Sequence, residues 1–404
     1  MRYMEIACSN KPSSNKMSFR KGITEMVFQI PEMEAYVIPS SIRICGNIRA
    51  YKDDANGDIS TTTANMDART GVYSTFNTVT TRSLRHQTTI EQSRHFNRFM
   101  ASYLPLSTSL NDTQSHLNQT ALTTPNQQQT KNGLITQSKS AGTDFCLPIP
   151  TGLLSGNSEL PLSSQWGVGG LELSIQLEND AQVFYSQTGV VAADLNPYYE
   201  IENPHLICEI MMPDEATLSK LRAQGSGQLT YQSITKLNNV AENGLATLMP
   251  TLATGVTNDI KQVQFLKGGT QFPALFPQNN VIRDSPNTSV CDAGLLRDYI
   301  DAVVPYSMNR NLSLVLANAN RNYQAVIQTG AINPVYHSIA SGGICYGLGV
   351  RYDSLGGSGS DFRNENWGLN MTLTNNDGNV VSAFIFVNSE QTLVYNSNGV
   401  QVVS

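Results

Sequence analysis

The residues of this sequence that could carry chemistry are its histidines, its cysteines and its grouped carboxylates. The chain of 404 residues has five histidines and six cysteines. His205 and Cys208 are three residues apart, so on an extended strand their side chains point to opposite faces of the sheet. A thiol nucleophile and its base must lie within hydrogen-bond reach. The spacing is therefore typical of a strand with one buried face, and not of a cysteine–histidine dyad.

Metal ligation by histidine or cysteine is not favoured by the spacing of these residues. A metal-dependent jelly-roll enzyme of the cupin type would need two histidines on one strand face, and no two histidines here are two residues apart. Glu91 and His95 have the i, i+4 spacing of a helix face, which an ordinary surface pair also has. The cysteines are far apart and form no C-x-x-C pair, which argues against a zinc site and a dense disulfide framework. We expect folding in a reducing, intracellular compartment.

Calcium and phosphate sites are not indicated either. Asp54, Asn56 and Asp58 begin like a calcium loop. However, Ile59 stands where that loop needs glycine, and Asn65 stands where it needs glutamate. No glycine-rich run is followed by Lys and Ser or Thr, as a phosphate-binding loop requires. We therefore predict no catalytic residue, no cofactor site and no metal ligand, and a protein that is not an enzyme.

One group of basic residues is dense enough to consider as a binding surface. A solvated or inter-subunit helix face is one interpretation, and contact with an anionic partner such as a genome or lipid headgroups is the other. The group consists of Arg82, Arg85, His86, Arg94, His95 and Arg98.

The composition indicates an all-β protein. Only 14% of residues are charged and the net charge is −6, while 40% are hydrophobic and the chain has 30 Gly and 17 Pro. Such a chain is too hydrophobic to be disordered and is not basic enough to bind nucleic acid by overall charge. Many short strands joined by polar turns are the expected result. No signal-peptide core or membrane-length apolar run is evident.

The most informative pattern is an internal repeat at about half the length of the chain. Trp166-Gly167 and Trp367-Gly368 each open an alternating apolar segment, and the two tryptophans are 201 residues apart. Three further matches keep the same order at offsets of 199–201 residues: Leu154 with Leu355, Leu104-Pro105 with Val304-Pro305, and Cys146 with Cys345. The sequence therefore predicts two copies of one β-unit, with both tryptophans buried in the core.

Alternation and capping signals predict the individual elements. Strands are expected at Met26–Ile30, Val37–Tyr51, Val72–Val79, Asp144–Ile149, Gly170–Glu178 and His205–Met212 in the first unit. In the second they are expected at Gln228–Ile234, Ile260–Leu266, Leu312–Ala317, Ile344–Tyr352, Gly368–Thr374, Ser382–Val387, Thr392–Tyr395 and Val400–Val403. Helices are expected at Ile90–Tyr103, Glu215–Gln224 and Val290–Val303. The middle helix follows Pro213-Asp214, stops at Gly225 and lies between the repeats, so we predict the domain boundary there.

Several segments resemble the double jelly-roll major capsid proteins of tailless icosahedral double-stranded DNA viruses, a family that includes adenovirus hexon, algal giant-virus capsids, virophages and polinton-like viruses. The run IPSSIRICGNIRAY, followed by GVYSTFNTV and TIEQ, looks like the opening strands of the smaller polinton-like members. The helix after Pro213 resembles the connector between the two jelly rolls. The segment AFIFVNSEQTLVYNSNGVQVV resembles their last strands.

The resemblance implies an all-β fold of two tandem eight-stranded antiparallel jelly rolls with a few short helices. Its divisions would be a polar, flexible N-terminal arm over 1–19, a first jelly roll over 20–213, a connector helix over 214–226 and a second jelly roll over 227–404. The implied function is a structural major capsid protein that forms homotrimeric, pseudo-hexagonal capsomers in the virion, after folding in the host cytoplasm or nucleus.

The implied partners are neighbouring capsomers and penton and minor capsid proteins, with an internal membrane or the genome touching the arm over 1–19. Another class of function stays open, because carbohydrate-binding and adhesin β-sandwiches also use polar loops. That class would be expected to have aromatic residues clustered in loops and an export signal, which we do not find in the sequence.

Overall fold

The computed structural model of the chain describes residues 2–51, 65–66, 70–107, 142–156, 158–185, 196–236, 260–272, 366–373 and 386–403. Every strand pairing among these residues is antiparallel. The predicted all-β class is therefore confirmed. Within the same residues, no helix has the length and apolar content needed to cross a bilayer.

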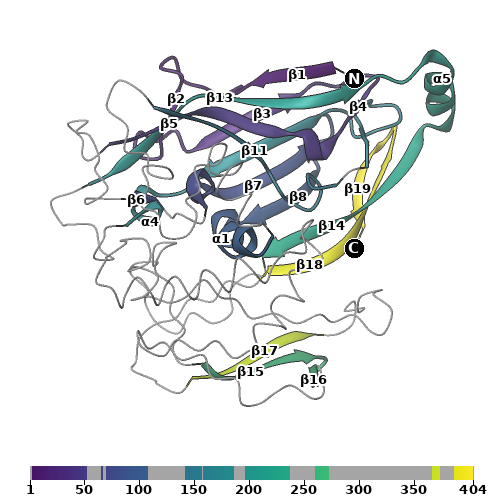
Figure 1. Cartoon of the computed structure of the whole chain (residues 1–404). Helices are drawn as coiled ribbons and strands as arrows, with labels where there is room; N and C mark the ends of the chain where they lie inside the picture. The colour runs from purple at the N-terminus through teal and green to yellow at the C-terminus, as the bar shows by residue number, and fades with distance from the viewer. Residues whose placement is uncertain are drawn as a thin grey trace.

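The first sheet is organised around the long strand β13, Tyr198–Met211. One edge of β13 carries β1 and β2, and the other edge carries β5 and β4, beyond which lie β9 and β10 (Figure 1). The remaining bounds are β1 Arg2–Ala7, β2 Lys16–Met17, β4 Tyr36–Val37, β5 Arg43–Tyr51, β9 Thr143–Pro148 and β10 Leu160–Pro161. The 3-10 turn η1, Pro39–Ser41, joins β4 to β5.

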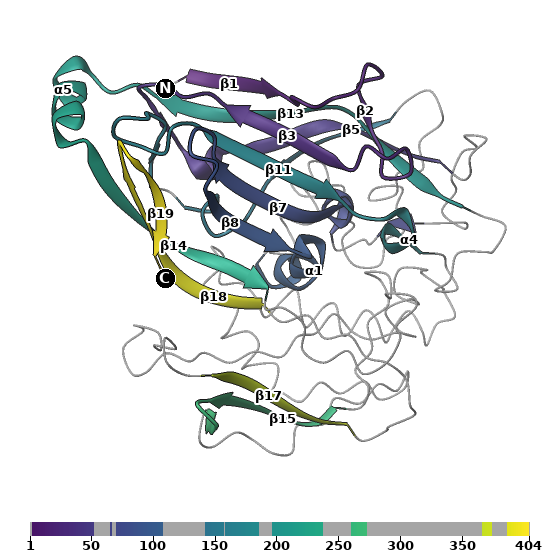
Figure 2. The same cartoon turned by 180° about the vertical axis from the view of Figure 1, so that it is seen from behind.

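The second sheet has four strands in the order β3-β11-β7-β8, and it packs face to face with the first (Figure 2). The bounds are β3 Glu25–Ile30, β7 Phe76–Ser83, β8 Thr89–Arg94 and β11 Leu171–Leu177. The 3-10 turn η2, Gly71–Thr75, leads into β7, and helix α1, Phe96–Ser107, follows β8. The short elements α4 Asp180–Val183, β6 Asn65–Met66 and β12 Phe184–Tyr185 lie beside this sandwich.

The strand connections are those of a jelly roll. The principal strands run in the orders β1-β13-β5-β9 and β3-β11-β7-β8 in the two sheets. Along the chain they alternate between the sheets, except that β7 and β8 form a hairpin within one sheet. Eight strands in two antiparallel sheets with this crossing pattern form two Greek keys. The first half of the chain is therefore one eight-stranded jelly roll.

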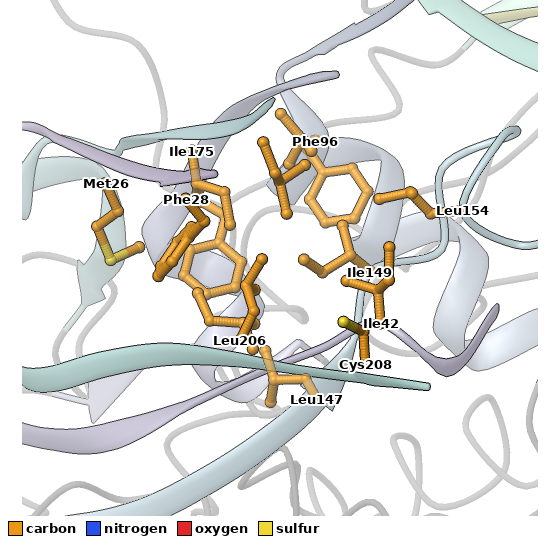
Figure 3. Packing of buried hydrophobic residues seen from close by; sticks show 14 of the residues in the cluster. Met26, Phe28, Ile42, Phe96, Leu147, Ile149, Leu154, Ile175, Leu206 and Cys208 are labelled. Atoms are coloured by element: carbon orange, nitrogen blue, oxygen red, sulfur yellow. The ribbon is translucent and has the colours of Figure 1, made fainter. Parts of the chain in front are cut away.

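The core lies between the two inner faces, because alternate residues of each strand point inward. Phe28 of β3 and Ile175 of β11 come from one sheet, while Leu147 of β9 and Leu206 of β13 come from the other (Figure 3). All four side chains are almost fully buried. Burying a side chain of this size contributes about 1.5–3 kcal/mol.

Two groups of strands are described in the second half of the chain. One is the sheet β14-β18-β19, with bounds Ser226–Lys236, Phe386–Asn396 and Gly399–Val403. The other is the sheet β16-β15-β17, with bounds Thr270–Phe272, Ile260–Lys267 and Trp367–Leu373. The strands expected at 312–317 and 344–352 and the helix expected at 290–303 lie outside the described residues.

The pairing of these strands repeats that of the first half. The first strand of each half pairs with a late one, β1 with β13 and β14 with β18. The second sheet repeats this relation, because β3 pairs with β11 and β15 pairs with β17. The two tryptophans do not occupy the same strand position, however. Trp367 opens β17, whereas Trp166 lies five residues before β11 and is 2% exposed.

Three local predictions can be compared directly with the structure. The connector helix is confirmed as α5, Glu215–Gln224, with the predicted bounds. The helix expected at 90–103 is wrong in its first part, because residues 89–94 form β8 against β7 and the helix begins at Phe96. The strand expected at 72–79 begins only at Phe76, because residues 71–75 form the turn η2.

The flexible arm predicted for residues 1–19 is also wrong. Residues 2–7 form β1, which pairs with β13 from Arg2↔Ile210 to Ala7↔His205. Ile6 and Cys8 are buried in the core cluster, as is Met17 of β2. Arg2 and Glu5 are exposed on β1, while the amine of Lys16, on β2, lies 3.3 Å from the carboxylate of Glu200. The first jelly roll therefore includes these residues. Because residues 2–7 are paired in its sheet, they do not form the free arm that was predicted to contact a membrane or the genome.

Candidate functional site

The residues considered for catalysis and metal binding are not brought together. Among the described residues, no group of three or more His, Cys, Asp or Glu could hold a metal ion. His205 is half-buried on the outer face of β13, while Cys208 points into the core, so the predicted opposite orientation is confirmed. Glu91 lies on β8 and not on a helix, and His95 follows that strand with φ 52°. The segment 54–58 lies outside the described residues.

The basic residues do not form one surface. Arg82, Arg85 and His86 lie near the turn of the β7–β8 hairpin, whereas Arg94, His95 and Arg98 lie at the opposite end, where β8 leads into α1. At the turn, Arg82 and Arg85 lie 3.8 Å and 3.5 Å from glutamate carboxylates. At the other end, Arg94 and Arg98 each donate a 2.9 Å hydrogen bond to a glutamine side chain. The six residues therefore share neither one helix face nor one surface for an anionic partner.

A set of hydrogen bonds joins the sheet β14-β18-β19 to the first jelly roll. We call it the junction, and define it by Ile90, Glu91, Gly152, Tyr231 and Ser233. The hydroxyl of Tyr231, on β14, donates to the backbone carbonyl of Ile90, on β8, at 2.9 Å. Burial raises the pKa of Tyr231, so this hydroxyl stays a donor at physiological pH. The junction thus ties the start of the second half to the last strand of the second sheet.

Glu91 lies at the centre of the junction and is 4% exposed. Its carboxylate accepts hydrogen bonds from the backbone N–H groups of Gly152 and Leu153, at 3.0 Å and 2.9 Å, and from the hydroxyl of Ser233, at 3.1 Å. Three donors on one carboxylate satisfy the requirement that a buried charge be hydrogen-bonded. One carboxylate therefore fixes a loop of the first half and a strand of the second.

The backbones also approach closely at the junction. A Cβ atom at Gly152 would lie 1.7 Å from the carbonyl oxygen of Gln232. Real Cβ atoms do not come so close to backbone, so only glycine fits at this position. Nothing in the sequence indicated Gly152, and Glu91 was considered only for its spacing to His95, because their partner strand is about 80 to 140 residues further along the chain.

Apolar packing continues the junction. Leu393 of β18 is fully buried and Val400 of β19 nearly so, and both belong to the same core cluster as the first jelly roll. The rings of Phe386, on β18, and Phe99, on α1, have centroids 5.5 Å apart. A shared hydrophobic core resists sliding or hinging between the parts that it joins. The position of the sheet β14-β18-β19 relative to the first jelly roll is therefore fixed by both polar and apolar contacts.

The connector α5 lies on the outside of the molecule, at one end of the sandwich (Figures 1 and 2). Asp214 caps it by accepting a 2.7 Å hydrogen bond from the N–H of Thr217, and Gly225 ends it with φ 60°. Arg222 binds both carboxylate oxygens of Glu34, at 2.8 Å and 2.5 Å. No residue of α5 is buried. The helix is a surface connector, and the ion pair of Arg222 with Glu34 holds it beside the first jelly roll.

Two buried carboxylates near the far end of the first sheet have opposite pKa shifts. Burial raises the pKa of Asp180 to about 6, although the N–H of Tyr199 and the charge of Arg20 oppose the change. Burial also acts to raise the pKa of Glu200, but hydrogen bonds and charge from Lys21 and Lys16 outweigh it and lower the value. These groups are structural, because each is enclosed by its own partners.

Comparison with known proteins gives matches only among solved structures. No protein-family model matches the sequence, and no curated protein matches it. One similar structure is from the Sputnik virophage, solved by cryo-EM, with a TM-score of 0.46 and 9% identity over 100% of this chain and 88% of that chain. Another is the mavirus major capsid protein, with a TM-score of 0.41 and 8% identity over 99% and 90% of the two chains.

A larger capsid protein is also similar. PBCV-1 VP54, fitted into a reconstruction of Sputnik, has a TM-score of 0.39 and 11% identity over 66% of this chain. The match covers 52% of VP54 and 60% of the chain in a model of the PBCV-1 capsid. The chain thus spans about half to three fifths of the length of these two proteins.

Proposed function

We propose that this chain is a structural major capsid protein, and that three copies of it form a pseudo-hexagonal capsomer in an icosahedral virion. The observation that carries the proposal is the repeated strand pairing, β1 with β13 and β3 with β11 in the first half, and β14 with β18 and β15 with β17 in the second. We place the second jelly roll over 227–404 and the connector over 214–226. The protein would fold in the host cytoplasm or nucleus.

The geometry of a shell explains why a duplicated sandwich is useful. Two jelly rolls in each of three chains give six similar sandwiches around a threefold axis. Such a ring has a nearly hexagonal outline, so it can tile the hexagonal positions of a closed shell. A threefold ring needs a heterologous interface, in which one half of a chain meets the other half of the next. Neighbouring capsomers and penton and minor capsid proteins are then the expected partners.

The junction supports this role, because a tile must keep its two halves at a fixed angle. Glu91 and Tyr231 join them by hydrogen bonds, and Leu393 joins them through the core. Jelly rolls are used by capsid proteins, lectins and cupins alike. The fixed relation between two halves distinguishes a building block from a single binding module, in which one sandwich would suffice.

Native mass spectrometry and negative-stain electron microscopy test the proposal. We expect a trimer of about 130 kDa, three times the 44.1 kDa chain, that persists at micromolar dilution and shows hexagonal outlines in projection. A monomer at the same dilution would overturn the proposal. A monomer that also binds an array of glycans would favour the carbohydrate-binding class instead.

A further inference from the structure

Cys45 and Cys146 are far apart in the sequence but lie directly opposite each other on β5 and β9. Their sulfur atoms are 2.9 Å apart. Opposed residues in an antiparallel ladder have Cα atoms about 4.5–5.5 Å apart. A disulfide spans about 4.4–6.8 Å between Cα atoms. The ladder alone therefore sets the two backbones at the separation that a disulfide requires.

The two thiols lie on the outer face of the first sheet. Their strand neighbours Ile44 and Leu147 belong to the core cluster, so the cysteines point the other way. Cys45 is 6% exposed, whereas Cys146 is half-buried and open to a small reagent. Cys208 is also a buried free thiol, but it lies on the core face, where burial raises its pKa to about 11. The pair therefore differs from Cys208 in having both a partner and access.

We propose that Cys45 and Cys146 form a redox site, in which a small disulfide such as oxidised glutathione converts the two thiols to a cross-strand disulfide. The Cys146 thiolate attacks the reagent and releases one glutathione thiolate. Cys45 then gives its proton to the released glutathione thiolate, attacks the Cys146 sulfur of the mixed disulfide as a thiolate and releases the second glutathione thiolate. The two protein thiols lose two electrons and their protons, and the reagent gains both as two thiols.

The surroundings of Cys45 fix the order of these steps. Burial, and then the hydrogen bond and charge of Cys146, raise the pKa of Cys45 to about 12. Cys45 is therefore a thiol in the resting protein, and the more exposed Cys146 reacts first. The bond would join strands 101 residues apart in sequence. A cross-link that closes so long a loop restricts the unfolded chain strongly. This inference does not depend on the proposed capsid function.

The test is to treat the purified protein with oxidised glutathione, block the remaining thiols with iodoacetamide in denaturant, and map the peptides by mass spectrometry. We expect a linked peptide pair containing Cys45 and Cys146, and a rise in Tm of about 5–15 °C that dithiothreitol reverses. Alkylated Cys45 after oxidation, a link to a different cysteine, or glutathione retained on Cys146 would each overturn the proposal.

Matched variants separate this site from general oxidation. Cys208→Ser should keep both the linked peptide and the rise in Tm. Cys146→Ser should lose both, and its half-buried side chain makes the substitution compatible with folding. If Cys146→Ser still shows the rise in Tm on oxidation, the stabilisation has another source and the proposal is wrong.

Discussion

The carboxylate of Glu91 on β8 accepts a hydrogen bond from the hydroxyl of Ser233 on β14, with the two oxygen atoms 3.1 Å apart. Both side chains are almost fully buried. Glu91 belongs to the first jelly roll and Ser233 to the strand that follows the connector, so this bond crosses from one half of the chain to the other. The backbone N–H groups of Gly152 and Leu153 donate to the same carboxylate and hold it in place opposite Ser233.

Substitution of Glu91 tests the junction. Glu91→Gln puts an amide N–H₂ among three donors, so one or more of them loses its acceptor. We expect a loss of about 2–4 kcal/mol in the free energy of unfolding, measured by urea denaturation. Ser233→Ala removes only one bond and should cost about 1 kcal/mol. Glu390→Gln, on the exposed face of β18, serves as the matched control and should have no measurable effect. Equal stability of the Glu91 and Glu390 variants would contradict the role of Glu91.

Substitution of Trp166 tests whether this residue anchors the core. Its side chain is 2% exposed, its ring centroid lies 5.2 Å from that of Tyr36, and its indole Nε1 has no hydrogen-bond partner among the described residues. Trp166→Ala should cost about 3–5 kcal/mol, because it leaves a cavity. Trp166→Phe keeps most of the volume and loses no hydrogen bond, so it should cost less than about 1.5 kcal/mol. Thermal unfolding followed by circular dichroism measures the stability of both variants. Equal losses of stability in Trp166→Ala and Trp166→Phe would show that the packing of the ring is not what stabilises the core.

The raised pKa of Asp180 predicts a specific dependence of stability on pH. Between the ordinary pKa of 3.8 and the folded value of about 6, the folded carboxyl group binds more protons than the unfolded one. The free energy of unfolding therefore falls as pH rises through this window and is constant above it. Asp180→Asn keeps the oxygen that accepts from the N–H of Tyr199. It should be about 1–3 kcal/mol more stable than the natural protein at pH 7, and equal to it near pH 4.

Glu200 gives the control of opposite sign. Its folded pKa lies below the ordinary value of 4.5, so its contribution to stability is fully present above pH 4.5 and is lost as pH falls below that value toward the folded pKa. Glu200→Gln should therefore be less stable than the natural protein at pH 7 and should approach it in acid. Urea titrations of both variants across pH 3–8 give the comparison. If the difference in free energy of unfolding between Asp180→Asn and the natural protein does not change with pH, the charge of Asp180 is not the cause of that difference.

Two residues of β1 test whether the N-terminal segment is part of the sandwich. Ile6 is buried against the core, whereas Tyr3 is 78% exposed on the same strand. Ile6→Ala should lower the free energy of unfolding by about 2 kcal/mol. Tyr3→Ala should leave it unchanged. If residues 2–7 were a detached tail, neither substitution would change the free energy of unfolding measured by chemical denaturation. That result would contradict the pairing of β1 with β13.

Local signals in the sequence predicted the connector most accurately. Asp214 can cap a helix and Gly225 can adopt a positive φ, and both act within one turn of the helix ends. The segment from Ile90 shows where such signals fail. Its apolar residues fit a helical period, but β7 offers a free edge, and the chain pairs with it until His95 turns with φ 52°. Tertiary pairing overrides local propensity there.

Contacts between distant residues could not be predicted in the same way. The strand β1 acquires its conformation by pairing with β13, some 200 residues later in the chain. The facing of Cys45 and Cys146 depends on the register of β5 with β9, which no local spacing encodes. Glu91 looked like a surface residue for the same reason. The repeat in the sequence nevertheless indicated the duplicated pairing, because both halves carry the strands that make it.

The pairing of Arg2 with Ile210 has a consequence for synthesis on the ribosome. The strand β1 has no partner strand until residue 210, about 200 residues later, has been translated, which takes about 10–40 s at ordinary rates. During this interval a hydrophobic strand would be open to association with other nascent chains. Four of the six residues of Arg2–Ala7 are apolar, so the charged side chains of Arg2 and Glu5 are what opposes such association until β13 is available.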